Sequence, residues 1–237
     1  MAVFTEESAR ANVRNQDGKR VFFLAEGDHL TPSAREWLRK ERIEILPAEQ
    51  LKKTEHRLLN GAVLLEKPEH MTHLRTGILV PKNHPRIRFR GQIDQLEAEL
   101  LLAGHYAASQ GDHDGAKQMK ELLDTTRTII RCDVLEEPVK VTTLCGYTME
   151  QLRTQSHLPQ KYFGQAHFMP EATDSQWLLR LNLIRTHIRQ AELSACDAFQ
   201  DRDGAISRDD MIRLLNRMSS LVWILMIRRK KEESHGT

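Results

Sequence analysis

Two arginines and a glutamate stand at helical spacing in the stretch LNLIRTHIRQAELSA, residues 181–195. Arg185 and Arg189 are four residues apart, and Glu192 follows three residues later. In a helix these three side chains project from one strip. A guanidinium stays charged and offers forked N–H donors that match phosphate oxygens, most effectively where water is scarce. The spacing therefore indicates an anion site, with an exposed i, i+4 charge ladder as the simpler alternative.

An apolar stripe runs along the same predicted helix and sets the environment of the charged strip. Its members recur at intervals of three and four residues, as expected of a helix with one buried face. They are Trp177, Leu181, Ile184, Ile188, Ala191 and Ala195. The charged strip lies beside this stripe and also holds Leu178 and Cys196. We therefore expect the two arginines and Glu192 to be at least partly desolvated.

Two other segments place charged or amide groups next to apolar helical positions. Residues 80–103 carry Lys82 ahead of a predicted helix and Asp94 on it, and in residues 214–225 Asn216 interrupts an apolar run. Each segment alone is compatible with the surface of a helical bundle. Together with the arginines they offer cations, an amide and carboxylates near the buried faces of three helices. Because the 12 glycines form neither a Rossmann nor a Walker phosphate loop, side chains and helix ends must hold any phosphate.

The stretch DRDGAISRDD, residues 201–210, is similar to part of a calcium-binding EF-hand loop. In that register the first ligand position falls on Phe199, which cannot bind calcium, and the last falls on Asp210, where a bidentate Glu is usual. The sequence therefore favours a turn that connects two helices, with calcium binding as the alternative.

The histidines and cysteines have no complete metal-ligand spacing. His70, His73 and His84 offer three imidazoles, but no carboxylate or cysteine completes a recognisable pattern. The chain has 11 histidines, so chance proximity is the simpler explanation, and a metal site at these three stays open as an alternative. The three cysteines are unclustered, which is typical of reduced thiols in a core.

The composition of the chain limits the classes of protein to which it can belong. It has 237 residues, 29% of them charged, and a formal net charge of +2. A nearly neutral chain without a basic stripe gives no indication of nucleic-acid binding. The longest apolar run, residues 221–227, is far shorter than the ~20 residues of a membrane span, and the N-terminus lacks the apolar core of a signal peptide. We expect a cytoplasmic protein that binds neither nucleic acid nor a membrane.

The pattern of elements predicts a small N-terminal α/β appendage followed by a helical bundle. Residues 20–48 read as strand, helix and strand, with Thr31 as the N-cap and Pro32 as the first helical residue, and residues 49–57 read as a linker. Long amphipathic helices with short connections imply a mainly α fold of about five helices. The helices are predicted at residues 85–109, 115–133, 148–156, 174–199 and 207–230, with loops between them, including one across 157–173. The two domains are predicted at residues 1–66 and 67–237.

Residues 221–227, LVWILMI, are apolar on every side of the last predicted helix. A helix without a polar face needs cover all round. This one is therefore central in the bundle or partly buried by another subunit.

Residues 80–103, 181–195 and 214–225 are the three polar segments described above. In this order, they resemble motifs of the ATP:cob(I)alamin adenosyltransferases of the propanediol-utilisation type. The first region of that family reads K-x-x-P-R-[VI]-x-x-x-G-x-x-D-x-L, matched here by Lys82, Pro85, Arg86, Ile87, Gly91, Asp94 and Leu96. The second reads R-T-x-x-R-x-x-E, matched by Arg185, Thr186, Arg189 and Glu192. The third reads L-N-R-[LM]-S, matched by Leu215, Asn216, Arg217, Met218 and Ser219. The resemblance covers the chain from Lys67 to its end.

Other stretches are similar to the ethanolamine-utilisation branch of this family. They are LTPSARE in the appendage, KPEHMTHL at 67–74, SHLPQKY at 156–162 and HFMPEA at 167–172. The Gly-rich phosphate segment T-G-D-x-G-T of the family is absent, and HMTHL stands where it would end. Some members of this branch carry a His followed by Cys-Cys-x-x-Cys, whereas this chain has no cysteine before Cys132, so a metal bound by such a cysteine motif is not expected.

The resemblance implies an enzyme that transfers the 5′-deoxyadenosyl group of ATP, bound with Mg²⁺, to the Co(I) of reduced cobalamin. Arg185 and Arg189 would be its catalytic residues. The implied ATP contacts are Thr72, His73, Lys82, Arg185, Arg189, Glu192 and Asn216. Asp94 would pair with Arg185 across a subunit boundary, and Phe168 with Met169 would cover the lower face of the corrin.

The resemblance also implies partners and a place in the cell. A homotrimer would form its sites between subunits, and a reductase and an ethanolamine ammonia-lyase system would supply its substrate and use its product. The protein would work in the cytoplasm or in association with a bacterial microcompartment. Because the Gly-rich segment is missing, a non-catalytic corrinoid or nucleotide carrier of the same fold is the alternative.

Overall fold

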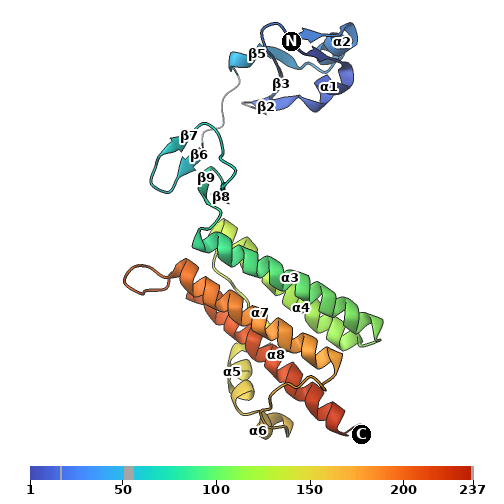
Figure 1. Cartoon of the computed structure of the whole chain (residues 1–237), viewed down its shortest axis with the longest axis vertical. Coiled ribbons are helices and arrows are strands. Elements are labelled where there is room, and N and C mark those ends of the chain that lie inside the picture. Colours follow the sequence, from blue (N-terminus) through green and yellow to red (C-terminus); the bar gives the residue numbers. More distant parts are fainter. Residues whose placement is uncertain (17, 51–55, 236–237) are drawn as a thin grey trace. The chain divides into compact units, whose positions relative to one another are not determined.

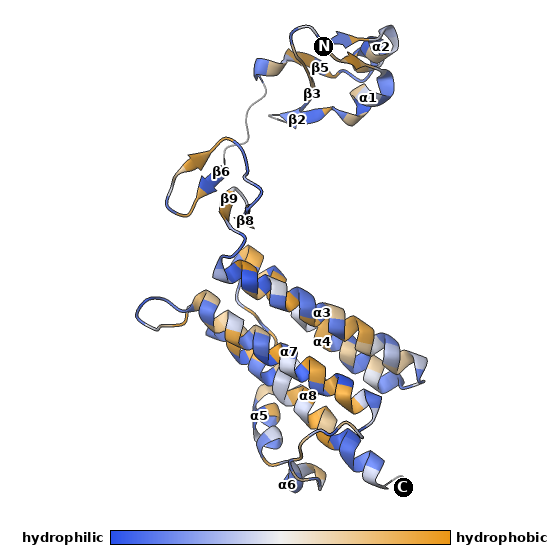
Figure 2. Ribbon diagram, viewed as in Figure 1, coloured by the Kyte–Doolittle hydropathy of each residue, from blue (hydrophilic) through white to orange (hydrophobic). Residues whose placement is uncertain are grey.

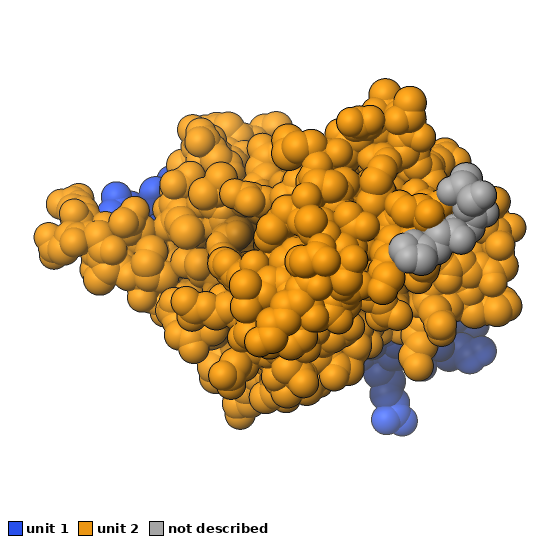
Figure 3. Space-filling model, turned by 90° about the horizontal axis from the view of Figure 1, so that it is seen from below, with its two compact units in different colours: residues 1–68 blue, residues 69–237 orange. Residues whose placement is uncertain are grey.

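The structure is a computed structural model that describes residues 1–16, 18–50 and 56–235. The chain forms two compact units, Met1–Pro68 and Glu69–Thr237, which are coloured separately in Figure 3. Part of the predicted linker, residues 51–55, lies outside the described residues. Figure 1 gives the element labels used below.

The first unit contains the predicted strand, helix and strand. Strand β3 (Lys19–Leu24) pairs in parallel with β5 (Glu44–Pro47), and α2 (Pro32–Lys40) connects them, so this prediction is confirmed. Strand β2 (Arg14–Gln16) extends the sheet antiparallel to β3. The remaining elements are β1 (Val3–Phe4), α1 (Glu6–Ala11), β4 (His29–Leu30), the 3₁₀ turn η1 (Ala48–Gln50), β6 (His56–Leu58) and β7 (Val63–Leu64).

Local chemistry explains where α2 begins and which face it buries. The hydroxyl of Thr31 accepts the backbone N–H of Ala34 at 3.3 Å, and Pro32 takes the first helical position, where no N–H is needed. Ala34 and Leu38, four residues apart, are fully buried. They form a small core with Ala9, Phe22 and Ile43. The appendage therefore has a core of its own.

The second unit is a helical bundle, and the mainly α prediction is confirmed. Its helices are α3 (Pro85–Ser109), α4 (His113–Leu135), α5 (Met149–His157), α6 (Pro159–Phe163), α7 (Gln176–Phe199) and α8 (Asp209–His235). The four long helices α3, α4, α7 and α8 lie side by side, and α5 and α6 pack against α8 (Figure 1). None of the described helices has the length and apolar content that a membrane span requires.

The predicted number of helices and the predicted location of the strands were both wrong. The described residues contain eight α-helices rather than about five, because the appendage adds two and α6 forms inside the predicted loop at 157–173. Pro159 at the first position of α6 and Gly164 at its C-cap explain this short helix. Strands are not confined to the appendage, since two hairpins belong to the second unit. They are β8 (Met71–Arg75) with β9 (Ile78–Pro81), and β10 (Thr143–Leu144) with β11 (Tyr147–Thr148).

The apolar run of α8 is covered by its own chain. Apolar and polar residues alternate along the long helices (Figure 2), whereas the run at 221–227 is almost wholly buried. Helix α7 covers one side of α8 and α5 covers another. Of the two explanations offered by the sequence, the central position in the bundle is therefore the correct one, and this run gives no separate indication of another subunit.

Residues 201–206 form a connecting turn, as favoured above. The carboxylate of Asp201 accepts the backbone N–H groups of Asp203 and Ala205, both at 2.9 Å, so it serves the turn itself. Helix α8 begins at Asp209, and the hydroxyl of Ser207 donates to the carbonyl of Phe199 at 3.0 Å. The carboxylate of Asp201 thus has partners within the turn.

A buried carboxylate fixes the start of α3 against α4. Asp133 is fully buried and accepts hydrogen bonds from Arg86 at 2.7 Å and Arg90 at 2.6 Å. Arg90 also donates to the backbone carbonyl of Leu74 at 2.8 Å. A buried charge requires this degree of compensation. Arg86, although part of the first family motif, therefore has a structural role within its own chain.

Candidate functional site

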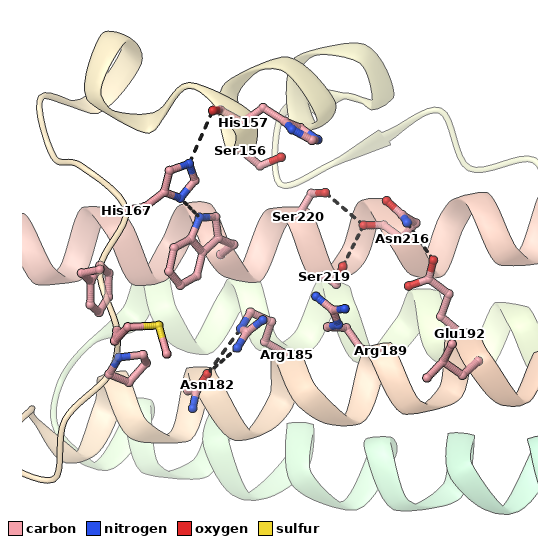
Figure 4. Close-up of a pocket in the computed structure, with 15 residues that line it drawn as sticks. Ser156, His157, His167, Asn182, Arg185, Arg189, Glu192, Asn216, Ser219 and Ser220 are labelled. Atoms are coloured by element: carbon pink, nitrogen blue, oxygen red, sulfur yellow. Dashed lines mark hydrogen bonds between the residues drawn. The ribbon is translucent and has the colours of Figure 1, made fainter.

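A cavity of about 810 Å³ opens between α5, α7, α8 and the segment 164–175, which we call the strap (Figure 4). The strap connects α6 to α7. The lining residues are Ser156, His157, His167, Phe168, Met169, Pro170, Asn182, Arg185, Arg189, Glu192, Leu193, Asn216, Ser219, Ser220 and Trp223. The first and last of them in the sequence, Ser156 and Trp223, are 67 positions apart. The helical packing brings these segments together.

Helix α7 presents Arg185 and Arg189 to the cavity, one turn apart (Figure 4). Arg185 is half-buried and donates two hydrogen bonds to the side-chain oxygen of Asn182, at 2.9 and 3.3 Å. Burial lowers the pKa of Arg185, and the charge of Arg189 lowers it further. Among the described residues, no carboxylate lies within 4.0 Å of either guanidinium. Two neighbouring cations without a counter-ion create a strong preference for an anion.

We expected Arg185, Arg189 and Glu192 to be partly buried, and two of these three residues are. Arg185 and Glu192 are half-buried, whereas Arg189 is exposed. An exposed guanidinium at the mouth of the cavity keeps its reach toward a bound ligand. The simpler alternative was an exposed i, i+4 charge ladder. Such a ladder needs a carboxylate beside the arginines, but Glu192 instead accepts a hydrogen bond from Asn216.

Glu192 on α7 contacts Asn216 on α8 at the wall of the cavity. The side-chain amide of Asn216 donates to the Glu192 carboxylate at 2.7 Å, joining α8 to α7. The backbone carbonyl of Asn216 accepts the hydroxyls of Ser219 and Ser220, each at 3.0 Å. This network fixes the polar side of the cavity.

Another part of the cavity lining is aromatic. The Phe168 ring stacks on the Trp223 indole with centroids 5.3 Å apart and planes 19° apart. The His167 ring is nearly parallel to the same indole, with planes 14° apart, and Trp223 donates its N–H to His167 at 3.2 Å. Met169 is 83% exposed, so its thioether is available for contact with a ligand. Stacked rings and an exposed thioether suit a flat, largely apolar ligand face.

Three contacts fix the strap and the adjoining end of α6 to the end of α8. Lys230 pairs with the buried carboxylate of Asp174, and Lys231 donates to the carbonyl of Phe163 at 2.8 Å. Ser175, the N-cap of α7, donates to Glu233. The wall that carries Phe168 is therefore fixed at both ends.

Four predicted site residues do not line this cavity in the single chain. Lys82 pairs with Glu69 at 2.9 Å on the surface. Thr72 and His73 belong to β8, where they pair with β9. Asp94 is exposed on α3, and no ion pair to Arg185 is present within the described chain. The bundle thus assembles the second and third motifs with the strap, but leaves the first motif outside.

The histidines considered for a metal have other roles or positions. The ring of His84 accepts the backbone N–H of Arg86 at 3.2 Å and caps α3. Burial, followed by the charges of Arg86 and Arg90, lowers its pKa. Across the described ranges, no three His, Cys, Asp or Glu side chains are grouped closely enough to hold a metal ion. Burial also raises the pKa of the Cys145 thiol to about 12, with Glu121 adding to the effect, so the metal-binding thiolate form of this residue is disfavoured.

Sequence reasoning missed several lining residues. Asn182 precedes the arginine motif by three positions, and helical spacing alone could have identified it as a neighbour of Arg185. Trp223 was assigned only to an apolar run, although its indole N–H requires a partner when buried. Ser156 and His157 end α5, and only the packing of α5 on α8 brings them to the cavity.

The cavity therefore combines an unpaired cationic side with an aromatic side. Such a cavity suits a polyanion bound next to a flat, apolar ring system. The polar network of Glu192 and Asn216 lies between α7 and α8, where it can orient the neutral part of the anionic ligand.

Comparisons with known proteins show the family of the chain. The chain is 28% identical to the corrinoid adenosyltransferase EutT of Salmonella typhimurium, over 94% of this chain and 90% of that protein. The same figures hold for the corrinoid adenosyltransferase EutT of Escherichia coli K12. The fold is similar to that of a variant PduO-type ATP:corrinoid adenosyltransferase from Lactobacillus reuteri, solved with cobalamin and ATP. The TM-score is 0.50 at 15% identity, with coverage of 78% of this chain and 93% of that one. The cobalamin adenosyltransferase family model matches residues 63–229, and the chain belongs to this family.

Proposed function

We propose that this protein transfers the 5′-deoxyadenosyl group of ATP to the cobalt of cob(I)alamin. The Co(I) electron pair attacks C5′ of ATP, the C5′–O bond breaks, and the electrons of that bond leave with triphosphate. The cobalt becomes formally Co(III) in adenosylcobalamin. The corrinoid brings the reactivity, whereas the protein supplies orientation and electrostatic stabilisation. Family membership supports this reaction.

The observation that carries the proposal is the pair of uncompensated arginines beside an aromatic wall. Arg185 and Arg189 would hold the triphosphate as negative charge develops on the leaving oxygen, which is where fixed cations accelerate a reaction most. Mg²⁺ bound to the triphosphate would neutralise the remaining charge. Phe168 and Met169 would cover the lower face of the corrin. An apolar wall there excludes an axial ligand and makes Co(II) easier to reduce.

We further propose a homotrimer in which Lys82, Thr72, His73 and Asp94 reach the arginine cavity of a neighbouring subunit. Two observations support it. These residues carry the first family motif or stand beside it, yet none lines the cavity of its own chain. In the described chain Asp94 also has no ion-pair partner and Arg185 has no carboxylate, so each would supply what the other lacks.

The biological setting we propose is ethanolamine catabolism in the cytoplasm. The EutT relatives support this setting, and the three free cysteines fit a reducing compartment. A reductase would supply the low-valent cobalt, and an ethanolamine ammonia-lyase system would use the adenosylcobalamin.

An anaerobic assay tests the reaction directly. The protein is mixed with MgATP and pre-reduced cob(I)alamin, and adenosylcobalamin is followed by absorbance while triphosphate is measured in parallel. We expect equal amounts of the two products. Binding of both ligands without either product would instead favour the non-catalytic carrier.

Subunit mixing tests the shared site. Light scattering should give the mass of three chains. Co-expression of Lys82→Ala with Arg189→Ala should recover part of the activity, because some mixed interfaces pair two wild-type residues. If each site lies within one chain, mixing restores nothing.

A further inference from the structure

His167 stands in the aromatic side of the cavity with a neighbour at each ring nitrogen. The indole N–H of Trp223 faces its Nδ1 at 3.2 Å, and the backbone carbonyl of His157 faces its Nε2 at 3.4 Å (Figure 4 draws the latter contact). An indole N–H can only donate and a carbonyl can only accept. The neutral imidazole must therefore carry its proton on Nε2 and direct the Nδ1 electron pair toward Trp223.

This arrangement has a chemical consequence in a corrinoid site. An imidazole binds metals through its unprotonated nitrogen and is the commonest protein ligand of transition metals. Nδ1 is the only nitrogen of His167 with a free electron pair, and the indole N–H occupies it. A nitrogen ligand on cobalt would stabilise Co(II) and oppose its reduction, which is the opposite of what the Phe168 wall provides.

Trp223 is well placed to impose this arrangement. It lies in the buried run of α8, so its backbone is held by the bundle core. Its ring also stacks on Phe168, and the Arg185 guanidinium lies 5.5 Å from its centroid. One indole therefore contacts the strap at two successive residues and the arginine side of the cavity at a third.

We propose that Trp223 is a positioning residue of the corrinoid site: its N–H occupies Nδ1 of His167 and so keeps this imidazole from ligating cobalt, while its ring supports Phe168. This inference rests on the proposed corrinoid function. It assigns to the Trp223–His167 pair the exclusion of a protein-derived axial ligand. Phe168 alone would not achieve this, because a histidine is its immediate neighbour in the chain.

Electron paramagnetic resonance of bound cob(II)inamide tests the proposal without turnover. This corrinoid has no nucleotide base of its own, so any axial nitrogen must come from the protein. An axial ¹⁴N ligand splits each cobalt hyperfine line into a triplet. We expect no triplet in the wild type and a triplet in Trp223→Phe, which keeps an aromatic ring but lacks the N–H. In Trp223→Phe/His167→Asn the triplet should disappear, because an amide nitrogen does not ligate.

Kinetics provide a second readout that a purely structural role would not produce. Trp223→Phe should slow adenosylation that starts from cob(II)alamin by roughly 2- to 10-fold, the effect of losing one neutral hydrogen bond, and should slow the reaction of pre-reduced cob(I)alamin less. Trp223→Leu also frees Nδ1 and serves as a second variant if Trp223→Phe is not folded at the assay temperature.

Three outcomes are distinguishable. A triplet in the single variants that vanishes with His167→Asn supports the proposal. A Trp223 variant that binds cob(II)inamide without a triplet, or a double variant that keeps the triplet, overturns it. If the spectrum of cob(II)inamide does not respond to the wild-type protein at all, the proposed corrinoid function itself is wrong.

Discussion

The side-chain amide of Asn216 donates a hydrogen bond to the carboxylate of Glu192 at 2.7 Å, and this contact joins the third family motif on α8 to the second on α7. A hydrogen bond to a charged group contributes about 1.5–3 kcal/mol. The pair therefore orders the polar side of the cavity before any ligand arrives.

Asn216→Ala should weaken ATP use by roughly 10- to 100-fold, because about 1.5–3 kcal/mol of charge-assisted hydrogen bonding is lost. Asn216→Asp should be worse, since it brings two carboxylates together. The measurement is the dependence of initial rate on ATP, with circular dichroism as the folding control. Glu192→Gln keeps an acceptor oxygen for Asn216 and should lose less. Equal effects of Ala and Asp at 216 would show that the contact is unimportant.

Arg189→Ala should reduce ATP use by roughly 10- to 100-fold, because the charge-assisted hydrogen bonds to triphosphate are worth about 1.5–3 kcal/mol. The fold should survive, since Arg189 is exposed. Arg189→Lys should recover only part of the loss, because an ammonium lacks the planar fork. Arg202→Ala, in an exposed turn outside the cavity, is the matched control. Unchanged ATP kinetics in folded Arg189→Ala would return α7 to the charge-ladder interpretation.

Phe168→Ala should slow adenosylation of cob(II)alamin more than that of pre-reduced cob(I)alamin. Only the first substrate depends on removal of the axial ligand before reduction. The two rates are measured on the same preparation, so any change in folding affects both equally. A uniform loss would make Phe168 a packing residue that supports Trp223 and nothing more.

Asp133→Asn should destabilise the second unit by about 3–5 kcal/mol, because Arg86 and Arg90 lose the counter-charge of a buried pair. Urea unfolding at neutral pH measures the change. The matched control is Asp124→Asn, which breaks an exposed i, i+4 pair with Lys120 and should cost about 0.5 kcal/mol or less. If both variants lost similar amounts of unfolding free energy, the buried Asp133 cluster would contribute no more to stability than an exposed ion pair.

The Asp174–Lys230 pair should stabilise the protein only within a pH window. The hydrogen bond from Lys230 lowers the pKa of Asp174, and the same bond raises the pKa of Lys230. The lowered carboxyl pKa contributes stability above the unfolded value of about 3.9, and this is lost as pH falls through the folded pKa. The raised ammonium pKa contributes stability below about 10.4, and this is lost as pH rises through its folded value.

The difference in melting temperature between wild type and Asp174→Asn should therefore be constant near neutral pH and shrink below about pH 4. Thermal scans across this range measure it. Asp197→Asn, an exposed aspartate on α7, controls for the loss of one negative charge. A difference that persists at pH 2 would assign the effect to packing of the strap rather than to the ion pair.

Periodicity and capping signals alone determined most of the fold. The predicted helix at 85–109 coincides with α3, because Pro85 stands at its first position and a long amphipathic pattern continues to its end. Thr31 and Pro32 likewise determined the start of α2. The short helix α6 and the β8–β9 and β10–β11 hairpins were missed, since a few residues give too little periodicity to distinguish them from loop.

For the site, the sequence by itself determined the chemistry of the residues and their order in three motifs. Helical spacing placed Arg185, Arg189 and Glu192 on one strip, because that depends only on the pitch of a single helix. Only the tertiary structure decided that Asn216 contacts Glu192, that Trp223 occupies a nitrogen of His167, and that Lys82 stays outside the cavity of its own chain. These contacts join residues far apart in the chain, and their geometry depends on how α5, α7, α8 and the strap pack together, which no local spacing specifies.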